Sequence, residues 1–408
     1  MKTHTPLSSI AEIQQLMLAA ADTDTINAEE TIKLEHAVGR VLATAQIAYI
    51  DVPPHDNSAM DGYAVRHEDA QTTSRLLVTQ RIPAGSNGSR LLPGTAARIF
   101  TGAPIPPDCD AVVMQEEVEV DGEQISLQKA VHVAQNIRRR GEDIAKGNEI
   151  LPAGHRLAPQ DLGLLASIGI AEVTVKRQLR VAVFFTGDEL VMPGQPLAAG
   201  QIYNSNRFML RGLLEKLGCQ IADLGNVPDQ LDATRATLRQ AAAENDLIIT
   251  CGGVSVGEED HVKAAVEAEG RLDAWKIAIK PGKPLAFGHI GKVPFIGLPG
   301  NPVSSFVTFL LFARPFILRQ QGQQQVSSPP CLARANFNWP KPDKRQEYLR
   351  ARLSLGADGQ SEATLFPQQG SGVLTSCSWA SGLVEVAPGQ VINHGDWVRY
   401  YPLADLGC

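Results

Sequence analysis

The sequence predicts a multidomain protein of the α/β and β classes, with a parallel-sheet α/β domain at its centre. Its 408 residues are enough for about two to four domains of ordinary size. In the middle of the chain, apolar runs alternate with helical patterns, which is typical of a sheet with crossover helices. Before and after this part, short β-branched runs are separated by Gly, Pro and Asn, which indicates small β domains.

The composition is that of a globular protein and excludes several function classes. Hydrophobic residues make up 44% and charged residues 20%, with a formal net charge of -7. Bulk positive charge for nucleic-acid binding is therefore missing, and an anionic ligand has to be held locally. The longest apolar stretch, residues 306–318, contains Arg314 and Pro315 and is shorter than the ~20 residues that cross a bilayer. We expect no membrane segment.

The N-terminus and the cysteines indicate a cytoplasmic protein. The first ten residues contain no apolar core like that of a secretory signal. The six cysteines are scattered, without a CxxC pair or a His-rich partner segment. We expect reduced thiols, not a zinc site or a disulfide framework.

The N-terminal part is expected to consist of a helical linker part and a β-rich insert. Ser9 and Glu12 have capping-box spacing, and apolar residues follow at helical intervals, so a helix is predicted at the start. A second helix is predicted over residues 28–37. The linker part is expected to comprise residues 1–44 and 141–177, with a helix near residues 160–168. The insert comprises residues 45–140, with strands expected at 76–78, 97–100, 111–115, 117–120 and 125–127.

The α/β domain is predicted over residues 178–327. Strand–helix–strand repeats imply a parallel sheet with right-handed crossovers. Helices are expected at 205–217, 231–244 and 261–268, with a long apolar helix from Pro302 onward. Strands are expected at 179–185, 220–224, 247–251, 275–280, 284–287 and 293–298.

A second small β domain is predicted over residues 328–408. The polar, Pro-ended segment 320–330 is typical of a linker. Strands are then expected at 349–355, 363–366, 383–386 and 396–400.

Three unusual loops follow strands of the predicted parallel sheet. They comprise residues 186–189, 252–260 and 299–304. Ligands of open parallel sheets bind beyond the carboxyl ends of the strands, where the strand order switches. We therefore expect the binding site in a crevice between these loops.

The second of these loops has the features of an anion cradle. Its glycines Gly252, Gly253 and Gly257 permit close backbone approach, Ser255 offers a hydroxyl, and a helix starts near Asp260. It matches neither a Walker loop nor a GxGxxG fingerprint. A plain glycine-rich turn with an aspartate N-cap explains the pattern equally well.

Lysines gather on the strand predicted over residues 275–280. The strand period of two places Lys276 and Lys280 on one face, opposite Trp275, and Lys283 follows in the next turn. Such a cationic patch suits phosphate or a metal oxyanion. The alternative is an edge strand protected by lysines.

Three acids in loops after predicted strands are candidate metal ligands. Mg²⁺ would be suited by Glu189, Asp229 and Asp260 together with phosphate oxygens and water. Three solvated loop acids that bind no metal would give the same sequence pattern. The charge run at residues 138–143 is typical of a solvated surface segment. His55 has no obvious Ser or Cys partner, so a catalytic triad is not expected.

Eight segments of the chain resemble one family. They are DVPPHDNSAMDGYAVR at 51–66, RIFTGAPIPPDCDAVVMQEE at 98–117, NIRRRGEDI at 136–144, TGDEL at 186–190, IYNSN at 202–206, DLIITCGGVSVGEED at 246–260, KIAIKPGKP at 276–284 and GLPGNPVS at 297–304. They closely resemble the MoeA family, the molybdopterin molybdenumtransferases related to the gephyrin E domain. The match covers nearly the whole chain in order and is looser after residue 320.

The resemblance implies an elongated homodimer of four-part protomers, with a molybdopterin-binding α/β domain and a C-terminal β barrel. It implies adenylylated molybdopterin and molybdate as substrates, release of AMP and assistance by Mg²⁺. Transient contacts with the molybdopterin adenylyltransferase and with molybdoenzyme chaperones would follow. A molybdopterin-binding scaffold and a pyrophosphate hydrolase without metal insertion stay open as alternatives.

The resemblance also implies roles for particular residues. The metal ligands would be Glu189, Asp229 and Asp260. The catalytic positions would be Asp61, Thr101, Asp143, Glu189, Asp229, Asp260, Lys276 and Lys280. The substrate-binding positions would be Gly252, Gly253, Ser255, Gly257, Pro299, Asn301, Pro302, Ser304, Arg350 and Ser371.

Two of these residues raise the question of symmetry. Asp61 and Thr101 belong to the predicted β-rich insert, which an elongated shape would carry away from its own crevice. A twofold dimer would bring each insert to the α/β domain of the other protomer, so that one site draws on two chains. The alternative is that the loop containing Asp61 packs on its own domain, which would be compatible with the same sequence.

Overall fold

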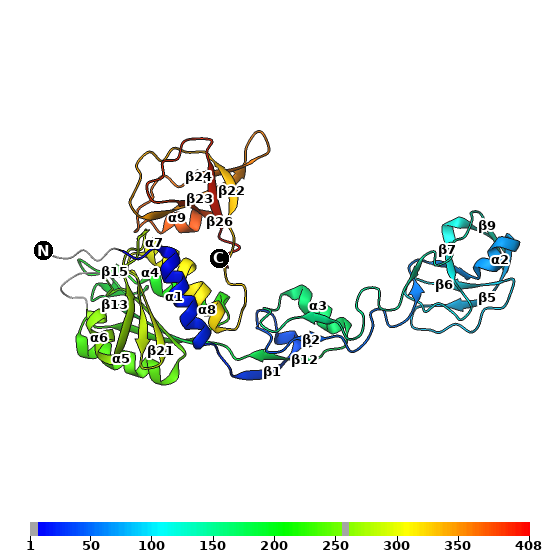
Figure 1. Ribbon diagram of the computed structural model, residues 1–408, viewed down its shortest axis with the longest axis horizontal. Helices are drawn as coiled ribbons and strands as arrows, with labels where there is room; N and C mark the ends of the chain where they lie inside the picture. Colours follow the sequence, from blue (N-terminus) through cyan, green and yellow to red (C-terminus); the bar gives the residue numbers. More distant parts are fainter. Residues whose placement is uncertain (1–6, 255–260) are drawn as a thin grey trace.

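The computed structural model describes residues 7–254 and 261–408 of the chain. The molecule is elongated (Figure 1). The α/β domain and a C-terminal β barrel lie together at one end, and the β-rich insert lies at the far end of a thin linker part. The multidomain α/β and β architecture expected from the sequence is thereby confirmed.

The first helix belongs to the α/β domain. Helix α1 (Ile10–Thr23) begins with the expected capping box, because Ser9 Oγ accepts from the Glu12 N–H at 3.2 Å and Glu12 Oε2 accepts from the Ser9 N–H at 2.8 Å. Its buried residues Ile10, Ile13 and Met17 join the core of the α/β domain. The expectation that this helix packs in the linker part is wrong.

The linker part is built from paired strands and one helix. The helix expected at 28–37 is instead strand β1 (Glu29–Lys33) and a 3₁₀ turn η1 (Leu34–His36). β1 pairs antiparallel with β12 (Glu172–Lys176), and β2 (Gln46–Ile47) pairs with β11 (Glu149–Leu151). Helix α3 (Pro159–Ser167) confirms the prediction for 160–168.

The insert is a six-stranded sheet with apolar residues on both faces. The strands expected there are confirmed. In spatial order they are β7 (Ala111–Met114), β4 (Gly62–Val65), β6 (Thr95–Ile99), β5 (Arg75–Ile82), β9 (Gln124–Leu127) and β8 (Val118–Asp121). Helix α2 (His67–Thr72), the 3₁₀ turn η2 (Gln115–Glu117) and a short pair, β3 (Asn57–Ser58) with β10 (Ile137–Arg138), complete it.

The charge run at 138–143 helps to join the insert to the linker part. Arg140 Nε donates to Asp51 Oδ2 at 2.6 Å, and the Arg140 N–H donates to Asp56 Oδ1 at 2.8 Å. Arg139 forms an ion pair with Asp56. Part of this run therefore crosslinks the two chain segments that enter and leave the insert.

The α/β domain contains a mixed six-stranded sheet. Its spatial order is β16 (Gln220–Val227), β13 (Arg180–Thr186), β17 (Leu247–Cys251), β21 (Val293–Leu298), β20 (Ala286–Ile290) and β18 (Gly270–Trp275). The first four strands are parallel, as expected. β20 runs antiparallel to both of its neighbours, β21 and β18. Helices α4 (Ser205–Lys216), α5 (Leu231–Glu244) and α6 (His261–Glu269) confirm the predicted helices. Strands β14 (Leu190–Val191) and β15 (Ile202–Tyr203) form a short pair beside the sheet.

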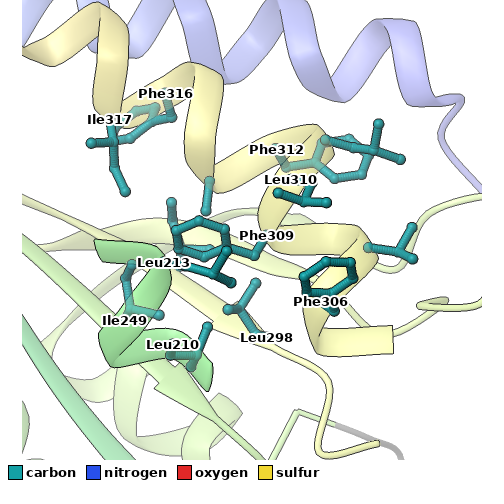
Figure 2. Packing of buried hydrophobic residues seen from close by; sticks show 14 of the residues in the cluster. Leu210, Leu213, Ile249, Leu298, Phe306, Phe309, Leu310, Phe312, Phe316 and Ile317 are labelled. Carbon is teal, nitrogen blue, oxygen red and sulfur yellow. The ribbon is translucent and has the colours of Figure 1, made fainter. Parts of the chain in front are cut away.

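The long apolar helix is continuous from Pro302 to Gln320 but contains a π-helical segment. It consists of α7 (Pro302–Thr308), η3 (Phe309–Ala313) and α8 (Arg314–Gln320), and Figure 2 shows its aromatic side chains packed against α4 and the sheet. Pro315 has no N–H to donate to the Leu311 carbonyl four residues earlier. Gln14 Nε2 of α1 donates to that carbonyl at 2.9 Å instead. By length and composition alone this helix is apolar enough to cross a membrane, but 78% of its apolar window is buried inside the molecule, as in the core helix of a globular protein.

The C-terminal part is a closed five-stranded barrel. Its strands follow the order β23 (Gln346–Leu355), β24 (Ser361–Leu365), β22 (Cys331–Ala335), β26 (Trp397–Pro402) and β25 (Gly382–Val386), and β25 pairs back with β23. Helix α9 (Thr375–Trp379) lies beside β23. The segment expected to be a linker packs on the α/β domain, since Gln321 is buried and donates to the Leu217 carbonyl at 2.9 Å.

The strand predicted over 275–280 is wrong. β18 ends at Trp275, and Lys276 adopts a left-handed φ of 71°. The chain then forms a separate strand, β19 (Ile279–Lys280), which pairs with β23 of the barrel. Lys276 and Lys280 therefore do not share one face of a single strand.

Candidate functional site

The three loops singled out in the sequence line one cavity of about 690 Å³. It lies at the carboxyl ends of β13, β17 and β21, and the strand order switches between β13 and β17. The predicted site residues that line it are Glu189, Asp229, Gly252, Gly253, Pro299, Asn301, Pro302 and Ser304. Ser255, Gly257 and Asp260 lie outside the described residues.

Two glycines make part of the cavity wall from bare backbone. Gly252 and Gly253 have φ values of 99° and 65°, as the loop pattern led us to expect. A Cβ on Gly252 would lie 2.6 Å from the Thr186 carbonyl oxygen, and one on Gly253 would lie 2.6 Å from Thr186 Oγ1. Only glycine fits at either position, so a ligand can approach the backbone closely here.

The cavity is acidic and offers oxygen ligands. Glu189 and Asp229 line it, and Asp188 Oδ1 accepts from the Asp229 N–H at 3.3 Å. Over residues 7–254 and 261–408, there is no cluster of three His, Cys, Asp or Glu side chains suited to a metal. Two carboxylates fit a hard cation such as Mg²⁺, which takes its remaining ligands from substrate phosphate and water.

Two helices begin at the cavity. Asn204 caps α4 and accepts from the Arg207 N–H at 3.1 Å. At the start of α7, Asn301 makes no side-chain capping bond, and the Val303 N–H donates to the Ser371 carbonyl of the barrel at 3.0 Å. Helix N-termini carry partial positive charge, so both ends favour an anionic ligand.

Lys276 and Lys280 do not line this cavity. Lys280 Nζ instead lies 2.9 Å from Glu347 Oε2 and 3.4 Å from Asp343 Oδ2, both in the barrel part. Hydrogen bonds from Arg345 hold the pKa of the Asp343 carboxyl well below its ordinary value, with Lys280 assisting. The expectation that both lysines face the crevice from one strand is therefore wrong, because the strand breaks and Lys280 joins the two domains.

The barrel contributes a wall through the loop that contains Ser371. Gly372 lines the cavity, and Arg350, only 1% exposed, donates from Nη2 to the Gly370 carbonyl at 3.2 Å. Its Nε donates to Ser376 Oγ at 3.0 Å, and burial lowers the pKa of the Arg350 guanidinium. Arg350 thus braces the loop whose Ser371 carbonyl meets α7.

Asp61, Thr101 and Asp143 lie away from the cavity of their own chain. Asp61 Oδ1 accepts the backbone N–H and the hydroxyl of Thr101, each at 2.8 Å, on the exposed surface of the insert. Asp143 is exposed beside the join between insert and linker, where its N–H donates to the Val52 carbonyl. Figure 1 shows β6, which precedes Thr101, at the opposite end of the molecule from the α/β sheet.

The sequence reasoning missed two polar residues of the cavity. Thr186 Oγ1 and Asn206 Oδ1 are buried and have no hydrogen-bond partner among residues 7–254 and 261–408. Asn206 Nδ2 donates to the Gly300 carbonyl at 2.7 Å and so holds the loop after β21. Both lie in segments that carry the family resemblance, TGDEL and IYNSN, but a threonine after a strand and an asparagine at a helix start gave no further sign of a role. Cys251 also lines the cavity, but burial raises the pKa of its thiol to about 11 and keeps it unreactive.

Comparisons with known proteins agree along the chain. Residues 8–169 match the MoeA N-terminal region (domain I and II), residues 182–319 match the family described as "Probable molybdopterin binding domain", and residues 333–403 match the MoeA C-terminal region (domain IV). Fold and site thus define a multidomain protein built around a molybdopterin-binding type of α/β domain.

Individual relatives place the chain more narrowly. It is 47% identical to the molybdopterin molybdenumtransferase of Haemophilus influenzae over 84% of this chain and 85% of that protein. It is 38% identical to molybdopterin molybdenumtransferase 2 of Mycobacterium tuberculosis over 79% and 83% of the two chains. The crystal structure of the molybdopterin biosynthesis moeA protein from Pyrococcus horikoshii OT3 aligns with a TM-score of 0.82 and 30% identity over 97% of this chain and all of that one. The chain belongs to the MoeA family of molybdopterin molybdenumtransferases, enzymes of molybdenum cofactor biosynthesis.

Proposed function

We propose that this enzyme inserts molybdate into adenylylated molybdopterin and releases AMP. The observation that carries the proposal is the cavity at the switch in strand order. Its bare backbone at Gly252 and Gly253 and the N-termini of α4 and α7 suit a phosphorylated ligand. Its two carboxylates supply ligands for a divalent cation.

Mg²⁺ would be held by Glu189 and Asp229, with Asp260 as the third acid from the same sequence pattern. When bound, the cation neutralises charge on the substrate's phosphate groups. Glu189 and Asp229 would hold it, and the backbone of the Gly252 loop would receive the phosphate of the pterin half of the substrate. Lys276, Lys280, Arg350 and Ser371 stay proposed oxyanion contacts, with Lys280 and Arg350 already engaged within the chain.

A homodimer with shared sites completes the proposal. Asp61 and Thr101 belong to the insert and Asp143 to the linker part, and none of them lines the cavity of the same chain. Figure 1 shows the insert at the opposite end of the molecule from the α/β domain. A twofold arrangement would place the insert of one protomer against the cavity of the other. We also infer a cytoplasmic location, with transient contacts to the molybdopterin adenylyltransferase that supplies the substrate and to chaperones that accept the product.

The test is AMP release from adenylylated molybdopterin with Mg²⁺ present, measured with and without molybdate. Release that requires molybdate supports coupled insertion. Release at the same rate without molybdate identifies a pyrophosphate hydrolase and overturns the proposal. Tight substrate binding without release under both conditions identifies a scaffold.

A further inference from the structure

The insert carries two arginines side by side around an aromatic ring. Arg81 of β5 and Arg98 of β6 are direct partners in neighbouring parallel strands. Tyr63 of β4 is the partner of Arg98 on its other side. The guanidinium carbons of Arg81 and Arg98 lie 4.7 and 4.6 Å from the centre of the Phe100 ring. Strands β5 and β6 and the residue after β6 thus place two cations around the Phe100 ring, with the buried Tyr63 beside Arg98.

Neither arginine has a carboxylate partner among the residues that the structure describes. Arg98 donates to the Gly62 carbonyl at 2.9 Å and to Gln115 Oε1 at 2.5 Å, which are both neutral acceptors. The Arg81 side chain forms no hydrogen bond or ion pair within the described part of the chain, and Arg81 is exposed. By contrast, Arg66 of the same insert pairs with Glu68 at 3.0 Å.

The fold brings two like charges together on neighbouring strands. The two guanidinium groups repel each other, and their contacts with the Phe100 ring offset part of this repulsion. Asp61 is near enough for the charge of Arg98 to contribute to the lowered pKa of its carboxyl, yet it forms no ion pair with Arg98 and its Oδ1 is occupied by Thr101. The positive charge of the two arginines is therefore left for a ligand.

The chemistry of that ligand follows from the groups present. Two adjacent guanidinium groups offer several N–H donors in planar forks, which match the oxygens of phosphate. The pair lies beside Thr101, at the end of the insert that we propose to face the partner's cavity. That cavity has two carboxylates and no Lys or Arg among its described lining residues. Beyond the helix N-termini and the proposed Mg²⁺, cationic side chains for an anionic substrate there would have to come from outside the cavity.

We propose that Arg81 and Arg98, stacked on Phe100, bind the phosphate of a nucleoside monophosphate. The inference rests on the proposed function, in which this group is the adenylate half of the substrate held in the partner subunit's cavity. It extends that function by assigning recognition of the leaving group to the insert and not to the α/β domain.

The test is calorimetric titration of the full-length protein with AMP, inorganic phosphate and adenosine. Arg81→Gln removes an exposed side chain without hydrogen bonds, so the fold should be unaffected. Loss of one charge-assisted contact should weaken AMP binding about tenfold or more. Arg98→Gln should also weaken AMP binding about tenfold or more, with circular dichroism to confirm folding.

The matched control is Arg75→Gln. Arg75 is an exposed arginine at the other end of β5, so this substitution should leave AMP binding unchanged.

Each result of the titration either supports or overturns the proposed phosphate site. AMP binding that falls in both variants, with weaker binding of phosphate and adenosine alone, supports the site. AMP binding that is unchanged in both variants, or absent in the parental protein, overturns it. Inorganic phosphate that binds as tightly as AMP overturns the nucleotide assignment. The titration needs neither molybdate nor turnover, so arginine-dependent AMP binding would stand even if AMP release proved independent of molybdate.

Discussion

Asp61 and Thr101 form a closed pair in which one carboxylate oxygen, Oδ1, accepts both the backbone N–H and the hydroxyl of the threonine, each at 2.8 Å. The two residues are 40 positions apart, and the pair links the turn before β4 to the loop after β6. The carboxylate is thereby oriented before any ligand arrives. Its exposure on the insert surface makes it available to a second molecule.

This pairing predicts a measurable shift in the acidity of Asp61. The Thr101 N–H, then its hydroxyl, and then the charge of Arg98 hold the pKa of the Asp61 carboxyl below its ordinary value of 3.8. The pairing therefore stabilises the fold above that ordinary value and is lost as the pH falls through the lowered pKa. Thr101→Val removes only the hydroxyl, so the pKa should rise toward 3.8 without reaching it. NMR titration of the carboxyl carbon measures this, and Thr95→Val in β6, the strand that precedes Thr101, should leave the value unchanged.

Two glycines of the cavity are predicted to differ in how strongly an added methyl group destabilises the fold. Gly252→Ala would place Cβ 2.6 Å from the Thr186 carbonyl oxygen at a φ of 99°. Among the residues that the structure describes, Gly300→Ala would meet only Gly252 Cα, at 3.7 Å. Gly252→Ala should lower the free energy of unfolding by about 1 to 3 kcal/mol, and Gly300→Ala by much less. Urea denaturation of both variants checks this. Equal stability would mean that the backbone at Gly252 is not constrained as described.

Lys280 is predicted to stabilise the contact between the barrel and the α/β domain. Glu347 is 2% exposed, and its other hydrogen-bond donor is Trp339 Nε1 at 3.3 Å. Because Lys280 is 42% exposed, the ion pair is partly screened, and we expect Lys280→Ala to cost about 1 to 3 kcal/mol of unfolding free energy.

A double-mutant cycle separates this role from ligand binding. Glu347→Gln in the Lys280→Ala background should recover part of the lost stability, because no buried charge is left unpaired. Lys276→Ala is the control, since the Lys276 side chain makes no ion pair in the described structure. A stable Lys280→Ala variant that loses only oxyanion binding would contradict the structural role.

The elements that the sequence predicted well are those with a long periodic pattern of their own. The helix expected at 231–244 has those bounds in the structure, and the parallel strands of the α/β domain lie where their apolar runs are. The errors occur where pairing with a segment that is distant in the sequence determines the local structure. Residues 29–33 form a strand because β12, over 130 positions later, pairs with them.

The site shows the same division between local and distant information. The loops around Glu189, Gly252 and Pro299 were found because each follows a strand, and parallel strands end at one edge. Lys276 and Lys280 were misplaced because a left-handed residue interrupts the alternation and the barrel captures the end of the segment. Neither event has a signature in the local sequence, since lysine rarely adopts a positive φ.

The final prediction tests whether one site draws on two chains. Asp61→Asn and Glu189→Gln chains should each be inactive alone, because the first lacks the insert carboxylate and the second lacks a cavity acid. In a random mixture about half of the dimers are heterodimers, and each heterodimer would have one intact and one doubly damaged site. AMP release should therefore recover to about a quarter of the parental rate. No recovery, with subunit exchange confirmed by mass spectrometry of differently labelled chains, would mean that each cavity is completed within its own chain.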